Sequence, residues 1–283
     1  MALLLQGPTA IEVGRITAVA WPGQTALATS LAEFADRSPD FPGVGPLPDR
    51  PIRLILAPTR ARYDSLTRGR LPLWSEGAAF PDASTIVLLT DHPPISPSAL
   101  RHELAHLALR WRVGYHAPLW FEEGYAAVAA AEWDRLDALR LNWQLARGVR
   151  MNLDDVERAL RGGRGDAETG YALATTAVLM LQRWGGERGL APLIANLPQA
   201  ESFDAALRTT YHVTESDFEE RWQRDIASRY GWLSLAGALG FFWLALGSVL
   251  AALVLLRRRR DRARRAALDA EETQMLDELE INE

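Results

Sequence analysis

Residues 96–130, SPSALRHELAHLALRWRVGYHAPLWFEEGYAAVAA, decide how this chain folds and where its chemistry lies. The stretch predicts two helices, the first beginning at Pro97 with Ser96 as its cap. His102 and His106 are four residues apart, so they lie one above the other on a single helical face. Two imidazoles at that spacing can bind one zinc ion, and Glu103 beside them can hold a zinc-bound water.

A third ligand is expected from the second helix, at Glu122 or Glu123. Glu123 lies 17 positions after His106, which leaves enough chain for one helix to end and the next to return. Two imidazoles and a carboxylate leave one zinc position open for water, the arrangement of a catalytic site. The alternatives are a helix with two surface histidines, and paired acids that only favour the dipole at a helix start.

The sequence HELAH followed by WFEEGYA resembles the gluzincin metallopeptidases, in their peptidase MA-like branch. In that group a W-x-x-E-G-x-A segment supplies the third zinc ligand. The resemblance implies a thermolysin-like fold, one zinc ion, Glu123 as its carboxylate ligand, Glu103 as general base, and a protein or peptide substrate. The matching positions of the second segment are Trp120, Glu123, Gly124 and Ala126.

Residues 168–197 are similar to a helical segment of aminopeptidase-N-like enzymes, where a tyrosine at a helix start points at the zinc. That similarity assigns Tyr171 as a hydrogen-bond donor to the oxyanion. Tyr125 and His212 are alternatives, and so is a Tyr171 that only packs in the core. The chain departs from the pattern of the gluzincins at Ala127, where thermolysin-like members carry an Asp that orients a zinc-bound histidine. It also departs at residues 77–81, GAAFP, where aminopeptidases carry a glutamate, and this favours an endopeptidase.

The order of the predicted elements, strands before helices, indicates an α+β domain with a small mixed sheet. The sheet-rich part covers residues 1–95 and the helical part residues 96–231, with a flexible loop at 162–166. The last predicted strand is expected to pair with an extended substrate. Strands are predicted at 10–21 (as one strand or a pair), 52–57, 77–80 and 85–90, and helices at 24–37, 60–67, 96–111, 119–147, 153–161, 168–184, 187–197, 201–210 and 215–230.

Residues 232–256 form a stretch of 25 residues without a charge, which predicts one transmembrane helix. Four arginines, 257–260, follow at once, so the tail 257–283 is expected in the cytoplasm and the domain 1–231 outside it. The first ten residues make a poor export signal, and we therefore expect the true start to be missing. Small residues four apart, Ala236 with Gly240 and Gly247 with Ala251, permit a homodimer through this helix.

The composition of the chain excludes several kinds of partner and catalytic group. A net charge of −5 argues against a nucleic-acid partner, and the absence of cysteine excludes a thiol nucleophile and thiolate zinc ligands. The sequence therefore predicts a membrane-anchored zinc metallopeptidase that acts on protein or peptide beside the lipid bilayer. Three alternatives stay open: a non-catalytic membrane-tethered zinc-binding module, a zinc hydrolase of non-peptide bonds, and a receptor-like domain with a signalling tail.

Overall fold

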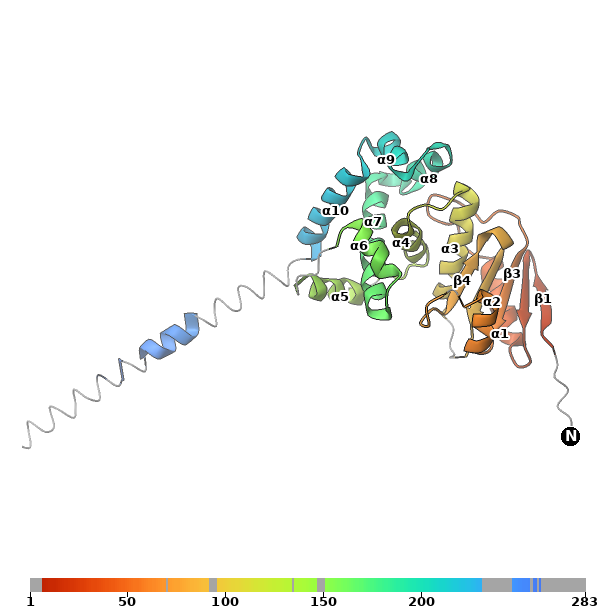
Figure 1. Ribbon diagram of the computed structural model, residues 1–283, viewed down its shortest axis with the longest axis horizontal. Coiled ribbons are helices and arrows are strands. Elements are labelled where there is room, and N and C mark those ends of the chain that lie inside the picture. The colour runs from red at the N-terminus through yellow and green to blue at the C-terminus, as the bar shows by residue number, and fades with distance from the viewer. Residues whose placement is uncertain are drawn as a thin grey trace, which may run out of the picture. The chain divides into compact units, whose positions relative to one another are not determined.

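The computed structural model describes residues 7–69, 71–91, 96–133, 135–146, 151–230, 246–254, 257, 258 and 260. The chain divides into two units, Met1–Tyr230 and Gly231–Glu283. The first unit is an α+β domain, with a five-stranded mixed sheet toward its N-terminus and a mostly helical C-terminal half (Figure 1). This agrees with the class predicted from the order of the elements.

The sheet begins with a hairpin and ends with a short edge strand. The expected pair at residues 10–21 is two strands, β1 (Thr9–Val13) and β2 (Ile16–Ala20), which pair antiparallel. The strand order is β1-β2-β3-β5-β4, with β3 at Ile52–Ala57, β5 at Thr85–Leu89 and β4 at Gly77–Phe80. Strand β5 is parallel to β3 and antiparallel to β4. The prediction that residues 85–90 pair with a substrate is wrong, because β5 has a neighbour on each side and β4 forms the edge.

Helices cover both faces of the sheet, and alternate residues of the central strand β5 meet different helices. Ile86 and Leu88 of β5 belong to the core that includes α1 (Thr25–Asp36) and α3 (Pro97–Val113). Val87 and Leu89 point the other way, into a smaller cluster with Tyr63 of α2 (Arg60–Thr67). This is the two-residue period of a strand buried on both faces. It explains why residues 85–89 read as a continuous apolar run.

The C-terminal half packs around aromatic side chains. Trp120 stacks on Phe218, with ring centroids 5.6 Å apart, and the indole N–H of Trp222 donates to the hydroxyl of Thr176 at 3.0 Å. Helix α3 contacts both the sheet and α4, and so joins the two halves (Figure 1). The helices of this half are α4 (Leu119–Ala129), α5 (Arg135–Ala146), α6 (Leu153–Leu160), α7 (Arg164–Trp184), α8 (Ala191–Asn196), α9 (Phe203–Tyr211) and α10 (Glu215–Tyr230).

Several predicted element boundaries are wrong, and the helix expected at 187–197 is one of them, since α8 covers only Ala191–Asn196. The single helix expected at 119–147 is interrupted, because α4 ends at Ala129 and Ala131 takes the left-handed conformation with φ 54°. Alanine is a strong helix former, so the local sequence does not predict that α4 ends here. The loop expected at 162–166 is shorter than predicted, because α7 already begins at Arg164.

The predicted transmembrane helix at 232–256 lies mostly outside the described residues. The described part, 246–254, is helical and its apolar side chains are exposed. Among the described helices, none has the length and apolar character needed to cross a bilayer. Residues 1–6, Ala236, Gly240 and nearly all of the tail 257–283 also lie outside the described part. The anchor, its orientation and the homodimer therefore stay predictions.

Candidate metal centre

Helix α3 presents both histidines on the face expected from their spacing. The hydroxyl oxygen of Ser96 accepts the N–H of Ser98 at 3.2 Å, and Pro97 occupies the first turn, which confirms the predicted helix start. The rings of His102 and His106 have their centroids 5.0 Å apart. Their side chains are partly buried, with 13% and 17% exposed. The two imidazoles thus form one half of a potential site.

Helix α4 brings a carboxylate to these imidazoles. The Oε2 atom of Glu123 lies 3.4 Å from Nε2 of His102 and 3.8 Å from Nε2 of His106. One ligand atom from each of the three residues lies within 4.8 Å of the others, so the group could hold a metal ion. Two ligands bound tetrahedrally to zinc at about 2.1 Å stand about 3.4 Å apart. The three predicted ligands therefore lie close enough together to hold a metal ion, and the two distances to Glu123 are near the separation expected around zinc.

Glycine at position 124 allows α4 to carry Glu123 this close. A Cβ atom at Gly124 would lie 2.7 Å from the carbonyl carbon of Ala174 and 2.8 Å from Val178, both on α7. Helices pack this tightly only where one side chain is missing. Tyr171 lies on α7 one turn before Ala174. Because α4 and α7 are so close, the phenol of Tyr171 reaches the carboxylate of Glu123 and forms a hydrogen bond with it.

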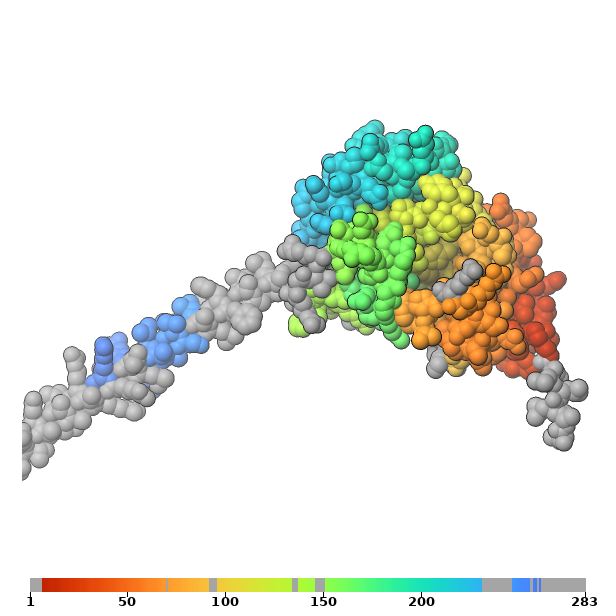
Figure 2. Space-filling view, viewed as in Figure 1, coloured from red at the N-terminus to blue at the C-terminus, as the bar shows by residue number. Residues whose placement is uncertain are grey.

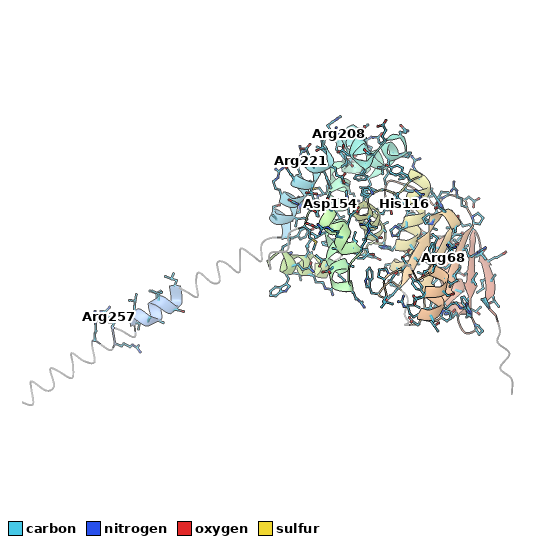
Figure 3. All side chains as sticks on the ribbon, viewed as in Figure 1. Arg68, His116, Asp154, Arg208, Arg221 and Arg257 are labelled. Atoms are coloured by element: carbon cyan, nitrogen blue, oxygen red, sulfur yellow. The ribbon has the colours of Figure 1, made fainter. Side chains whose placement is uncertain are left out.

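The neighbouring Glu122 has a different role. Its Oε1 accepts the backbone N–H of Ala117 at 2.9 Å and lies 3.3 Å from Nδ1 of His116. His116, labelled in Figure 3, lies in the segment between α3 and α4. Of the two glutamates left open by the residue pattern, the structure places Glu123 at the histidines and ties Glu122 to the preceding loop.

A carboxylate that the sequence did not point to completes the surroundings of His102. The Oε2 atom of Glu132 lies 3.0 Å from Nδ1 of His102. The chain reaches this position through the turn that ends α4, where the N–H of Glu132 donates to Ala127 at 3.0 Å and that of Ala131 donates to Val128 at 3.2 Å. These are the two hydrogen bonds of a Schellman turn. Glu132 thus supplies the orienting carboxylate that is absent at position 127.

An arginine next to the first histidine ties α3 to the end of α4. The Nε of Arg101 donates to the carbonyl of Ala129 at 2.6 Å. Its other nitrogens donate to Ser38 at 2.7 Å and to the carbonyl of Asp40 at 3.0 Å. These bonds connect three segments around the turn that carries Glu132. Nothing in the sequence pointed to this residue, because its partners are backbone carbonyls and the Ser38 hydroxyl, all far away in the chain.

The charges in the cluster follow from burial and from the converging acids. Burial lowers the pKa of His102, but its hydrogen bonds with Glu123 and Glu132 outweigh burial and raise the pKa well above its usual value. Burial lowers the pKa of His106 to about 4. Burial raises the pKa of Glu123, but His106, His102 and the Tyr171 hydrogen bond bring it down to about 2. Near neutral pH these shifts favour a protonated His102 and a neutral His106 imidazole.

Glu103 lies under the edge strand of the sheet. A Cβ atom at Gly77 of β4 would lie 2.9 Å from its carboxyl carbon, and the backbone of Ala79 makes a hydrogen bond with it. The phenol of Tyr63 holds this part of β4 by donating to the carbonyl of Gly77 at 2.6 Å. Burial, the largest influence, raises the pKa of Glu103 to about 7. Such a carboxyl can both accept and release a proton near neutral pH.

Tyr171 reaches the cluster from α7. Its ring contacts those of Trp74 and His102, with centroids 6.2 and 6.3 Å apart. Burial and its hydrogen bond with Glu123 raise the pKa of the phenol, which therefore stays protonated and can donate. Neither alternative, Tyr125 or His212, is among the residues that line the cavity at the cluster.

The cluster opens into a cavity of about 480 Å³. Its walls come from β4 and the segment before it, from α3 and α4, from the C-terminal end of α6 and from Tyr171 of α7. Figure 2 shows this face hollowed between the orange surface of residues near 60–80 and the green surface near α6. His102, Glu103, His106, Glu123 and Tyr171 all line the cavity. A substrate entering it would meet the three candidate ligands and both candidate catalytic groups.

Comparison with known proteins adds no assignment: no model of a known protein family matches the chain, and no curated protein matches it.

Proposed function

We propose that this protein is a zinc-dependent peptidase of the gluzincin type. The observation that carries the proposal is the convergence of His102, His106 and Glu123 at a spacing that suits zinc, with Glu103 lining the same cavity. A site that served structure alone would need the three ligands but no partly buried carboxyl beside them. The presence of Glu103 therefore favours catalysis over a non-catalytic binding module.

The residues fit zinc in kind as well as in spacing. Two imidazole nitrogens and one carboxylate are the protein ligands of hydrolytic zinc sites, which keep a fourth position for water or substrate. Bound there, zinc supplies Lewis-acid chemistry that activates water and polarises a carbonyl. Glu132 orients His102 so that its Nε2 faces the cluster, as outer carboxylates do in such sites.

Two side chains supply the proton transfer and the stabilisation of the oxyanion. Glu103, whose pKa lies near 7, accepts the proton of the attacking water and later delivers it to the leaving amine. Tyr171 keeps its phenolic proton and donates a hydrogen bond to the oxyanion of the tetrahedral intermediate. Both groups line the same cavity as the three candidate ligands, so both can reach a substrate that is bound there.

The edge strand β4 supports a peptide as the substrate. No described strand pairs with its outer side, and it runs past Glu103, so an extended peptide can add to the sheet there. Strand β4 carries no carboxylate that would hold a substrate amine, and this favours an endopeptidase over an aminopeptidase. We further propose, from the uncharged stretch 232–256 and the arginines after it, that the domain is anchored to a membrane and acts outside the cytoplasm.

Metal analysis combined with a peptide-cleavage screen tests this function. We expect one zinc ion per chain, cleavage within unblocked and blocked peptides, and loss of cleavage with a chelator. Glu103→Gln should keep the zinc and lose turnover, whereas alanine at His102, His106 or Glu123 should lose the zinc itself. Cleavage by Glu103→Gln at the wild-type rate, or purified protein that takes up no zinc, would contradict the proposal.

A further inference from the structure

A third side chain continues the line of the two histidines along α3. Arg110 follows His106 by four residues, as His106 follows His102, so all three lie on one face of the helix. Four residues advance a helix by about 6 Å. Arg110 lines the same cavity as the candidate ligands. A positive charge therefore stands one helical turn beyond the metal centre, within reach of a bound substrate.

The charge of Arg110 is poorly compensated by the protein. Its side chain is 20% exposed, and its ion-pair partner within the described part of the chain is Asp82, at 3.6 Å. The Asp82 side chain is 88% exposed, and ion pairs with so much water around them contribute little. A partly buried guanidinium with so weak a partner is suited to a carboxylate that arrives with the substrate.

Among the described residues, two other basic side chains line the cavity outside the candidate ligands, and both have partners. Arg161 lies 3.1 Å from Glu157, and its side chain is 62% exposed. His116 is paired with Glu122 at 3.3 Å. Of these described side chains, Arg110 is the most buried and has the most exposed acidic partner, so it is the one best placed to meet an added acid.

Strand β4 leads from the catalytic centre to this arginine. Its first residue, Gly77, lies against Glu103. Just beyond its other end, the indole N–H of Trp111 donates to the carbonyl of Pro81 at 3.1 Å, beside the Arg110–Asp82 pair. A peptide that lies along β4 therefore passes both Glu103 and Arg110.

We propose that Arg110 binds a carboxylate of the substrate and makes the site selective for peptides that carry a carboxylate close to the scissile bond. This inference rests on the proposed function, because it assumes a peptide in the cavity. A guanidinium forms strong, charge-assisted hydrogen bonds with a carboxylate, often two at once. The carboxylate comes either from an acidic side chain near the scissile bond or from the peptide's C-terminus.

Binding to the zinc-loaded, inactive Glu103→Gln protein tests the inference without turnover. Fluorescent peptides carry Glu or Gln at each position flanking the scissile bond, with amidated ends, and a Gln peptide is also made with a free C-terminus. We expect about tenfold tighter binding of one carboxylate-bearing peptide than of its neutral partner. Preference for the internal Glu peptide assigns the side chain as the source, and preference for the free end assigns the terminus.

Variants of α3 then identify the residue responsible. Adding Arg110→Gln should abolish the preference, and Arg110→Glu should transfer it to a peptide with Lys at the same position. Arg112→Gln is the matched control, because Arg112 is exposed on the same helix and does not line the cavity. Survival of the preference in Arg110→Gln, or its equal loss in Arg112→Gln, would overturn the inference.

The two proposals fail separately. If the acid preference depends on Arg110 while wild-type protein cleaves no peptide, the hydrolytic function is wrong and the carboxylate site stands. If wild-type protein cleaves Glu and Gln peptides with equal kcat/KM and binding shows no preference, the carboxylate site is wrong and the peptidase stands. Absence of both binding and cleavage would overturn both.

Discussion

The Nδ1 atom of His102 lies 3.0 Å from Oε2 of Glu132, although 30 positions separate the two residues in the chain. This contact fixes which imidazole nitrogen faces the metal site, since Nδ1 is engaged and Nε2 points at Glu123. It depends on the left-handed Ala131, which ends α4 and turns the chain back toward α3. An orienting carboxylate thus comes from a helix end here and not from the helix itself.

Glu132→Gln should weaken zinc binding without preventing it. The amide is as long as the carboxylate but carries no charge, so it orients His102 less firmly and makes it a poorer ligand. Outer carboxylates of this kind contribute about 10- to 100-fold in metal affinity. Competition with a chromophoric chelator measures the change. Glu168→Gln is the control, because that exposed glutamate pairs with Arg164, and an equal loss in this variant would contradict the role of Glu132.

Zinc binding should release about one proton at neutral pH. In the metal-free protein the pKa of His102 is raised, so the imidazole is protonated, and zinc needs it neutral. His106 and Glu123, with pKa values of about 4 and 2, have already lost theirs. Affinity should therefore rise about tenfold per pH unit until the pH exceeds the pKa of His102.

Calorimetry in buffers of different ionisation enthalpy counts the released protons. The Glu103→Gln protein is used, so that the carboxyl with a pKa near 7 does not contribute. Binding that releases no proton and does not vary between pH 6 and pH 8 would show that His102 is neutral before the metal arrives.

Tyr171→Phe separates two roles of the phenol. The variant keeps the ring that contacts Trp74 and His102 and removes the hydroxyl. If the hydroxyl stabilises an oxyanion, kcat should fall about 10²- to 10³-fold while zinc affinity changes little. If it only holds Glu123, zinc affinity should fall instead. Steady-state kinetics at saturating zinc, together with zinc titration, distinguish these results.

Gly124→Ala should destabilise the domain. The added methyl group would meet the backbone of α7 at Ala174, which cannot move without shifting the whole helix. Overpacking of this kind costs about 1–3 kcal/mol. Denaturant unfolding measures the loss, and zinc affinity should fall with it because α4 carries Glu123. Gly165→Ala in α7 is the control: no atom lies within 4 Å of its added methyl group, so stability should stay level or rise.

The sequence by itself determined most elements and the pair of histidines at the site. The strands at 52–57 and 77–80 and the helix that carries both histidines were predicted from patterns within a few residues, and α3 begins at the capping pair as expected. Side-chain periodicity and capping are local properties, so they can be read without knowing what packs against the segment. The spacing of four residues likewise predicted that His102 and His106 lie on one face of that helix.

Only the tertiary structure decided which strand is the edge, where α4 stops, and which acids meet the histidines. The interior place of β5 depends on the order of strands in the sheet, and no short pattern encodes that order. The sequence around Ala131 predicts a helix, yet in the folded domain this residue takes the left-handed conformation. Glu132 and Arg101 act through partners far away in sequence, so their contacts exist only once α3 and α4 have packed together.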